Sequence, residues 1–340
     1  MLETPPATIR TPPPARRRFR RPKIPKWVDS AFAILGLATL VYVVSRYPLG
    51  QIAAECRAIG PRVVLVFLLP LGWILSGATA VYLLLERRVT WRRVLWARFA
   101  ADAYNALFFS VGGEPFRVRF LSRFVSTDQV LSALLRDRML DMISGYLVSA
   151  VFLFISLGRY TLPSALSAGL YAYAAVTFVL GLAGALLVTS RLPARFGGFV
   201  LRALGGSANS PLTRLPTREL VRVLPFYALS RALGVLENGA LIWLLGGRFD
   251  LVLAGFFDGA LNAAGAISFF VPGSLGVYEG ISVYLFNLLA LGGPQGVVFG
   301  LVRRARMLTF NAIGVALHWL GRRSGEEGLL KVKDEVGPAP

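Results

Sequence analysis

Long apolar runs alternate with short basic stretches along most of this chain. A helix needs about 20 mostly apolar residues to cross a hydrocarbon core about 30 Å thick. Runs long enough to cross such a core with some tilt recur along the sequence. They cover residues 28–45, 63–85, 139–157, 166–189, 223–246 and 297–320.

Two further apolar regions, 94–125 and 251–291, are interrupted by polar residues and by glycine-containing breaks. Irregular backbone survives at membrane depth only where protein or water satisfies its polar groups. We therefore predict that both regions are re-entrant hairpins. The arms of the second, 251–271 and 275–291, are apolar enough to be two full spans instead. The expected fold is an all-α integral membrane protein, with six full spans plus two re-entrant hairpins, or up to eight spans.

A short pattern occurs in both halves of the chain. Each copy has an Asn-Ala pair, a glycine-containing break that ends in one glutamate, and then Arg-x-Arg-Met-Leu. The first copy comprises Asn105, Glu114 and residues 136–140, and the second comprises Asn262, Glu279 and residues 304–308. Chance similarity is the alternative for so short a match. The pattern predicts half-repeats over about 28–157 and 166–320, inverted because each half crosses the membrane an odd number of times.

The composition supports a membrane protein. Of the 340 residues 55% are hydrophobic and 16% are charged, and the mean hydropathy is +0.60. A soluble domain carries about a quarter charged residues. The net charge of +19 could indicate nucleic-acid binding. The arginines lie between apolar runs, however, which is typical of cytoplasmic loops, so we expect no nucleic-acid partner.

The basic stretches also predict the orientation and the ends of the chain. With both termini inside, every strongly basic connection is cytoplasmic, and the connection 46–62 is external. Residues 1–27, rich in Pro and Arg, are expected to be a disordered cytoplasmic arm near anionic lipid. A multi-pass domain over 28–320 and a cytoplasmic tail over 321–340 would follow. The expected location is the cell's inner (plasma) membrane.

Glu114 and Glu279 are the first candidate site residues. A carboxylate at membrane depth is costly and usually faces a cavity or a partner. The alternative is that each glutamate caps a broken helix by binding its free N–H groups. If both face one cavity, like charges at low dielectric repel, so at least one is expected to be protonated or paired with Arg138 or Arg306.

Arginines are the natural complement, because the guanidinium group binds phosphate oxygens and stays charged. Arg138 and Arg306 occupy equivalent places in the repeat, and Arg117 follows the first break. Ion pairing within the protein and extension toward the interface are the alternatives. Asn105 and Asn262 add a polar face to the entering arm of each hairpin, as a water-filled cleft would need.

The backbone breaks are assigned a structural role, and no cofactor or metal site is expected. These breaks comprise Gly112, Gly113, Pro272, Gly273 and Gly276. The single cysteine, Cys56, excludes an internal disulfide, and the single histidine, His318, offers no metal-binding pair. No hydrolase signature or nucleotide-binding loop is present.

At these positions the chain resembles the flippase-like membrane domain of lysylphosphatidylglycerol synthetases. The resemblance covers roughly residues 28–320 and is carried by three motifs in order. They are Gly-Gly-Glu-Pro-Phe-Arg at 112–117, Arg-Asp-Arg-Met-Leu-Asp at 136–141 and Pro-Gly-Ser-Leu-Gly-Val-Tyr-Glu at 272–279. Val111 stands where the family commonly has proline, and Tyr278 where it often has arginine. Headgroup contacts at these two positions are therefore expected to differ.

The resemblance implies movement of lipids between membrane leaflets. Membrane lipids are the expected partners, and the lipid would be anionic, phosphate-bearing or glycosylated. The aminoacyl-transferase domain of the synthetases is not expected, since only a short charged tail follows Leu320. A non-transporting partner of a lipid-synthesis enzyme is the first alternative. An intramembrane lipid-modifying enzyme, with Glu114 or Glu279 as general base, is the second.

Overall fold

A computed structural model describes residues 38–39, 41–107, 113–189, 216–267 and 276–323. Every regular element within these ranges is a helix, which confirms the predicted all-α class for them. The elements are α2 (Leu49–Ile59), the 3-10 helix η1 (Gly60–Val63), α3 (Val64–Leu84), α4 (Trp91–Leu107), α5 (Gly113–Leu121), α6 (Thr127–Arg159), α7 (Ser164–Thr189), α9 (Thr217–Leu244), α10 (Leu251–Ile267), α11 (Val277–Leu288) and α12 (Gly293–Arg323).

The helices lie where the long apolar runs predicted spans, with three clearly earlier starts, of which that of α9 is at Thr217 rather than at 223. The runs 63–85, 166–189 and 223–246 correspond to α3, α7 and α9. Helix α6 begins at Thr127 rather than at 139, because its charged first turns lower the hydropathy without breaking the helix. Ser126 caps this start by accepting the backbone N–H of Gln129 at 3.4 Å. Helix α12 begins at Gly293 rather than at 297.

The connection 46–62 is not the loop that the sequence predicted. Most of it forms the helix α2, which contacts α12 and buries Ile52 and Ile59. The predicted span 28–45, the arm 1–27 and the tail 321–340 fall largely outside the described residues.

Three described helical segments are long and apolar enough to cross a membrane: Leu49–Leu84, α6 and Ser164–Val188. Helices α9 and α12 have 28 and 31 residues, but they are not among the segments that are apolar enough by the same measure. The outer surface suits lipid, since α7 exposes Val176, Val179 and Leu186. Helices α6 and α9 turn several polar side chains inward, as an apolar solvent requires, and these are Ser132, Asp137, Ser149, Ser156, Glu237 and Asn238.

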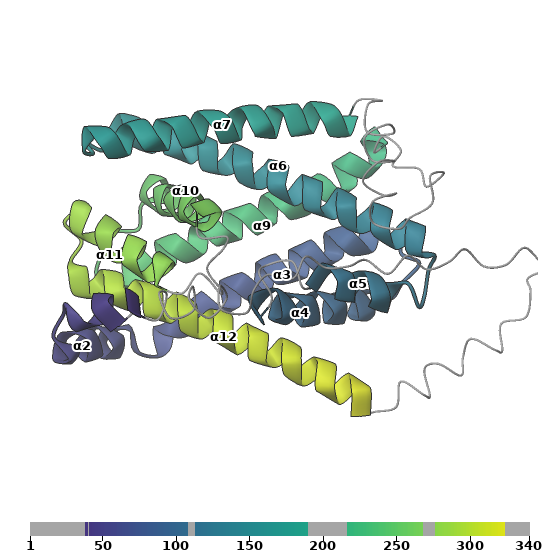
Figure 1. The fold of residues 1–340 in the computed structure, drawn as a ribbon, viewed down its shortest axis with the longest axis horizontal. Coiled ribbons are helices and arrows are strands. Elements are labelled where there is room, and N and C mark those ends of the chain that lie inside the picture. Colours follow the sequence, from purple (N-terminus) through teal and green to yellow (C-terminus); the bar gives the residue numbers. More distant parts are fainter. Residues whose placement is uncertain (1–37, 40, 108–112, 190–215, 268–275, 324–340) are drawn as a thin grey trace, which may run out of the picture.

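Helices α3 and α9 pack along each other through the middle of the molecule (Figure 1). The hydroxyl of Ser76 on α3 donates to the carbonyl of Phe226 on α9 at 2.7 Å. A Cβ at Gly72 would lie 2.8 Å from a methyl group of Leu233, so the small residue permits the close approach. The two helices belong to different halves of the chain, and their contact joins these halves.

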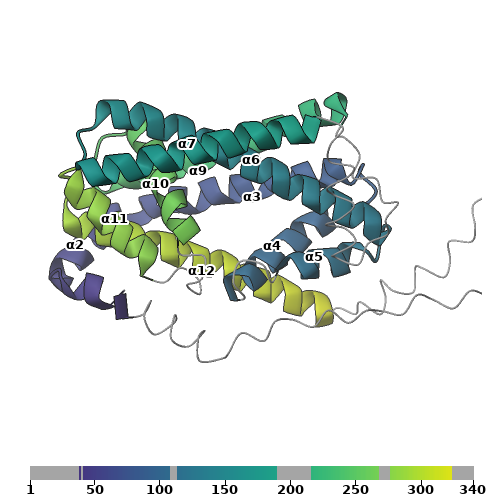
Figure 2. The ribbon, with the colours of Figure 1, turned by 45° about the horizontal axis from the view of Figure 1, so that its top comes forward.

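Two further contacts join helices of the two halves, one on either side of this central pair. Helix α4 packs on α12, and α10 packs on α6. A Cβ at Gly314 of α12 would lie 2.2 Å from the carbonyl oxygen of Phe99 on α4. A Cβ at Gly255 of α10 would lie 2.0 Å from the ring of Phe152 on α6. Figures 1 and 2 show α4 and α5 toward one end of the elongated bundle, and α10 and α11 toward the other.

We predict that Gly314→Ala lowers the apparent melting temperature of the purified protein in detergent. The added methyl group meets the backbone of α4, and overpacking of this kind costs about 1–3 kcal/mol. Gly169→Ala is the matched control, since a Cβ at Gly169 of α7 has nothing within 4 Å. An unchanged melting temperature for Gly314→Ala would mean that the contact between α4 and α12 is looser than described.

Candidate functional site

Both candidate glutamates lie in the first turn of a short helix that follows a break. Glu114 is in the first turn of α5 and Glu279 in that of α11. A helix N-terminus carries partial positive charge, which favours a carboxylate there. Gly276 precedes α11 with φ of 76°, a left-handed conformation that suits glycine. Of the other predicted breaks, Gly113 begins α5, while Gly112, Pro272 and Gly273 lie outside the described residues.

Glu279 forms a buried ion pair with Arg304 of α12. Arg304 Nε is 2.8 Å from one carboxylate oxygen and its Nη2 is 3.2 Å from the other. The Glu279 side chain is 2% exposed. Gly300 makes this approach possible, because a Cβ there would lie 3.0 Å from the Cα of Glu279. The pair holds α11 against α12.

A second buried ion pair joins α12 to α9. Arg306 Nη1 is 2.7 Å from a carboxylate oxygen of Glu237. Next to it, Arg303 donates to the amide oxygen of Asn238. The amide nitrogen of Asn238 donates in turn to Asp258 of α10 at 3.3 Å. Neighbouring arginines of α12 thus serve different partners, because they project from different faces of the helix.

In the first half, Glu114 pairs within its own helix. Arg117 lies one turn later, and its Nη1 is 3.2 and 3.3 Å from the two oxygens of Glu114. Its Nη2 is 3.1 Å from Asp137 of α6. Asp137 also accepts the hydroxyl of Tyr227 from α9 at 2.7 Å. The buried carboxylate of Asp137 therefore connects α5 to the second half of the chain.

Arg231 makes a second link between α9 and α6, one turn from the first. Its guanidinium lies 2.5 Å from the carboxylate of Asp141 and 3.3 Å from the Ser144 hydroxyl. A Cβ at Gly145 would lie 3.1 Å from the guanidinium carbon, so glycine leaves the room that Arg231 occupies. On α4, Arg98 is 3.6 Å from Asp102 and 4.0 Å from Asp137, which extends the charged network to α4.

The two candidate asparagines bind protein groups. Asn105 accepts the backbone N–H of Gly113 at 2.8 Å, and so holds the start of α5 against α4. Asn262 donates at 3.0 Å both to Ser149 of α6 and to Asp258, one turn earlier on α10. Each therefore has a clear structural contact, and binding of substrate by either one stays a prediction.

In three ion pairs of this network the carboxylate is more exposed than its arginine. The side chains of Asp102, Glu114 and Asp141 are 36%, 35% and 32% exposed, and those of their partners Arg98, Arg117 and Arg231 are 17%, 6% and 24% exposed. The other pairs differ, since Glu279 and Glu237 are 2% and 4% exposed and are more buried than Arg304 and Arg306. Among the described residues, no three acidic, histidine or cysteine side chains are grouped to hold a metal ion.

The structure gathers most of the predicted site residues but pairs them differently. Glu114, Arg117, Glu279 and Arg306 all lie in the charged network. The predicted pairing of the glutamates with Arg138 or Arg306 is wrong, since the partners are Arg117 and Arg304. Arg138 is exposed on α6, away from the neighbouring buried Asp137, and its role in substrate binding stays a prediction.

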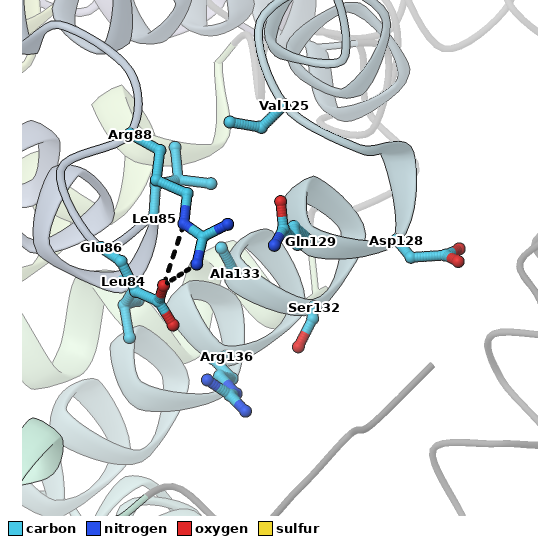
Figure 3. A pocket seen from close by; sticks show the side chains of 10 residues that line it. All are labelled: Leu84, Leu85, Glu86, Arg88, Val125, Asp128, Gln129, Ser132, Ala133 and Arg136. Atoms are coloured by element: carbon cyan, nitrogen blue, oxygen red, sulfur yellow. Dashed lines mark hydrogen bonds and ion pairs between the residues drawn. The ribbon is translucent and has the colours of Figure 1, made fainter. Parts of the chain in front are cut away.

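A pocket of about 200 Å³ lies beside the network, between α6 and the end of α3 (Figure 3). Gln129, Ser132 and Arg136 of α6 form one wall, and Arg136 is also 3.6 Å from Glu219 of α9. Glu86 and Arg88, joined by an ion pair at 2.7 Å, form part of the opposite wall. No sequence pattern predicted this pocket, because its walls come from separate segments.

Comparison with known proteins identifies the family. A family model described as the lysylphosphatidylglycerol synthase TM region matches residues 27–314. No curated protein and no solved structure matches the chain. The match covers most of the chain and includes the charged network together with both glutamate-bearing helices. With its apolar helices, the protein is a membrane protein, and it belongs to the family of the lysylphosphatidylglycerol synthase TM region.

Proposed function

We propose that this protein moves a lipid between the leaflets of the plasma membrane. Its family indicates a role connected with membrane lipids. The observation that carries the proposal is the charged network between the two halves, in which Asp102, Glu114 and Asp141 are partly exposed beside less exposed arginines. Charged side chains at membrane depth are costly and mark the path of a polar group. The acyl chains of the lipid would stay in the bilayer while its headgroup passes this charged network.

The helix lengths support two re-entrant hairpins. Helices α5 and α11 have 9 and 12 residues. At 1.5 Å per residue they reach about 14 and 18 Å, well short of a hydrocarbon core of about 30 Å. Such short helices at membrane depth are tolerated where they line a cavity. We therefore place the α4–α5 and α10–α11 pairs as hairpins that enter the membrane without crossing it.

The exchanged packing supports an inverted repeat. Helix α4 of the first half packs on α12 of the second, and α10 of the second packs on α6 of the first. The two hairpins lie toward opposite ends of the bundle (Figures 1 and 2). Transporters built from inverted repeats bind substrate between the repeats, at the broken helices. In the proposed arrangement one hairpin enters from the cytoplasm and the other from outside.

A liposome assay tests the proposal directly. The purified protein would be reconstituted with trace fluorescent phospholipids, polyprenyl-phosphate lipids and glycolipids, and leaflet exchange followed by quenching with a membrane-impermeant reductant. We expect accelerated exchange for at least one anionic or glycosylated lipid. Exchange no faster than in empty liposomes for every class would reject transport, and would favour a non-transporting partner of a lipid-synthesis enzyme.

We predict that Glu114→Gln slows this exchange about tenfold, which corresponds to about 1.4 kcal/mol in the barrier. The substitution removes charge at a partly exposed position, while Arg117 keeps Asp137 as a partner. Glu55→Gln is the matched control, because Glu55 lies on α2 outside the charged network, and Gln keeps an acceptor oxygen for the side chain of Gln295. A wild-type rate for Glu114→Gln would restrict Glu114 to capping α5, since Gln keeps an acceptor oxygen.

We predict that substitution of Glu279 lowers the stability of the folded protein. Glu279→Gln removes the carboxylate charge 2.8 Å from the buried Arg304, and breaking a buried ion pair typically costs 3–5 kcal/mol. The melting temperature in detergent should therefore fall sharply. The double variant Glu279→Gln/Arg304→Gln should recover part of the loss, because neither charge of the pair remains. Additive losses in the double variant would show that the ion pair contributes no coupling energy.

The orientation is testable with the native cysteine. Cys56 is exposed on α2, at the end of the bundle that we propose to be external. A membrane-impermeant maleimide should label it in intact cells. Arg88→Cys in a Cys56→Ser background should react only after permeabilisation, because the basic connection after α3 is proposed to be cytoplasmic. The reverse labelling pattern would overturn the orientation.

A further inference from the structure

The two short helices α5 and α11 differ in the neighbour that each contacts most closely. Helix α11 packs along the following helix, α12, where a Cβ at Gly296 would lie 2.7 Å from the Cα of Val283. Helix α5 packs instead along the preceding helix, α4. Its Phe120 ring centroid is 4.2 Å from that of Trp96. The contact of α4 with α12 corresponds to the contact of α10 with α6, so this packing occurs in both halves. The halves differ most in the packing of α5 and α11.

The repeated motif defines which positions of α6 and α12 correspond. Aligning residues 136–140 with residues 304–308 matches three positions that lie one turn apart on each helix. The matched pairs are Asp128 with Gly296, Ser132 with Gly300, and Arg136 with Arg304. On α12 these positions form the face that contacts α11.

On α6 the matched face lines the pocket. Asp128, Ser132 and Arg136 are all among its lining residues (Figure 3). The surface that holds a short helix in the second half is therefore an open space of about 200 Å³ in the first. The two glutamates differ in the same way as the two short helices. Glu279 pairs with Arg304 of α12, whereas Glu114 pairs with Arg117 of its own helix.

We propose that the protein has a second conformation in which α5 and α11 exchange these arrangements. In it, α5 packs along α6 with side chains that enter the pocket, and α11 leaves α12 and packs back along α10. Because the repeats are inverted, this exchange would close the site toward one side of the membrane and open it toward the other. The inference rests on the proposed function, for which it supplies the conformational step.

Disulfide formation tests the exchange without any transport measurement. A Cβ at Gly300 would lie 3.2 Å from the Cβ of Glu279, close to the spacing of a disulfide. The matched positions in the first half are Glu114 and Ser132. In a Cys56→Ser background, Glu114→Cys/Ser132→Cys should form a disulfide in a fraction of the molecules. Val118→Cys/Asp128→Cys, matched to Val283 and Gly296, serves if the first pair does not fold.

A second pair reports the conformation described here. A Cβ at Gly296 would lie 2.9 Å from the Cβ of Phe286, so Phe286→Cys/Gly296→Cys should link α11 to α12. In a variant with both pairs, we expect chains with either disulfide but none with both. Intact-mass measurement after maleimide alkylation distinguishes these species, because each disulfide protects two thiols.

The control combines the α11–α12 pair with Ile143→Cys/Gly184→Cys between α6 and α7. A Cβ at Gly184 would lie 2.7 Å from a side-chain carbon of Ile143, and neither α6 nor α7 moves in the proposed exchange. Both disulfides should form in the same chains. Chains that carry both the α5–α6 and the α11–α12 disulfide would overturn the exchange. So would a folded protein in which neither α5–α6 pair can be oxidised.

The outcome is separable from the proposed function. Disulfide yields in detergent do not depend on whether a lipid is moved, and the liposome assay does not depend on the disulfides. Mutually exclusive disulfides with no lipid exchange would retain the two conformations and reject transport. Lipid exchange without an α5–α6 disulfide would retain transport and reject this conformational step.

Discussion

The cost of placing a charge at membrane depth governs this structure. An ionised side chain is tolerated there only when a partner or water compensates it. Buried arginines accordingly face carboxylates on neighbouring helices, as Arg304 faces Glu279 and Arg306 faces Glu237. Glycine makes several of these approaches possible, because a side chain at Gly300 or Gly145 would occupy the space that the charged pair needs. The pairing of buried charges and the close packing of the helices therefore depend on the same positions in this bundle.

The sequence predicted the helices well because the thickness and apolarity of a bilayer directly determine the length and hydropathy of a spanning run. The break that ends at Gly113 and the first-turn positions of both glutamates also agree with the structure. The helix starts were less predictable, since the charged first turns of α6 hide it from a hydropathy average. Charged residues that pair within the protein count against a span in such an average, although they cost little once paired.

The partners in the site could not be predicted, because they depend on the rotation of each helix. Arg304 and Arg306 are two residues apart and therefore point to different neighbours, α11 and α9. The matched Arg138 is exposed on α6, so the repeated motif does not guarantee a repeated contact. Tyr227 carried no signal as a single aromatic residue in an apolar run. It is recognisable only through Asp137, which it reaches from the other half of the chain.

The two links between α9 and α6 have a consequence for biosynthesis. Asp137 and Asp141 are synthesised before Tyr227 and Arg231, and they remain in α6 without those partners until α9 arrives. A charged segment such as α9 is a poor candidate for insertion by its own hydrophobicity. A pre-existing pair of carboxylates would lower the cost of inserting its arginine. The order of synthesis thus places the acidic member of both links in the first half and the groups that bind it in the second.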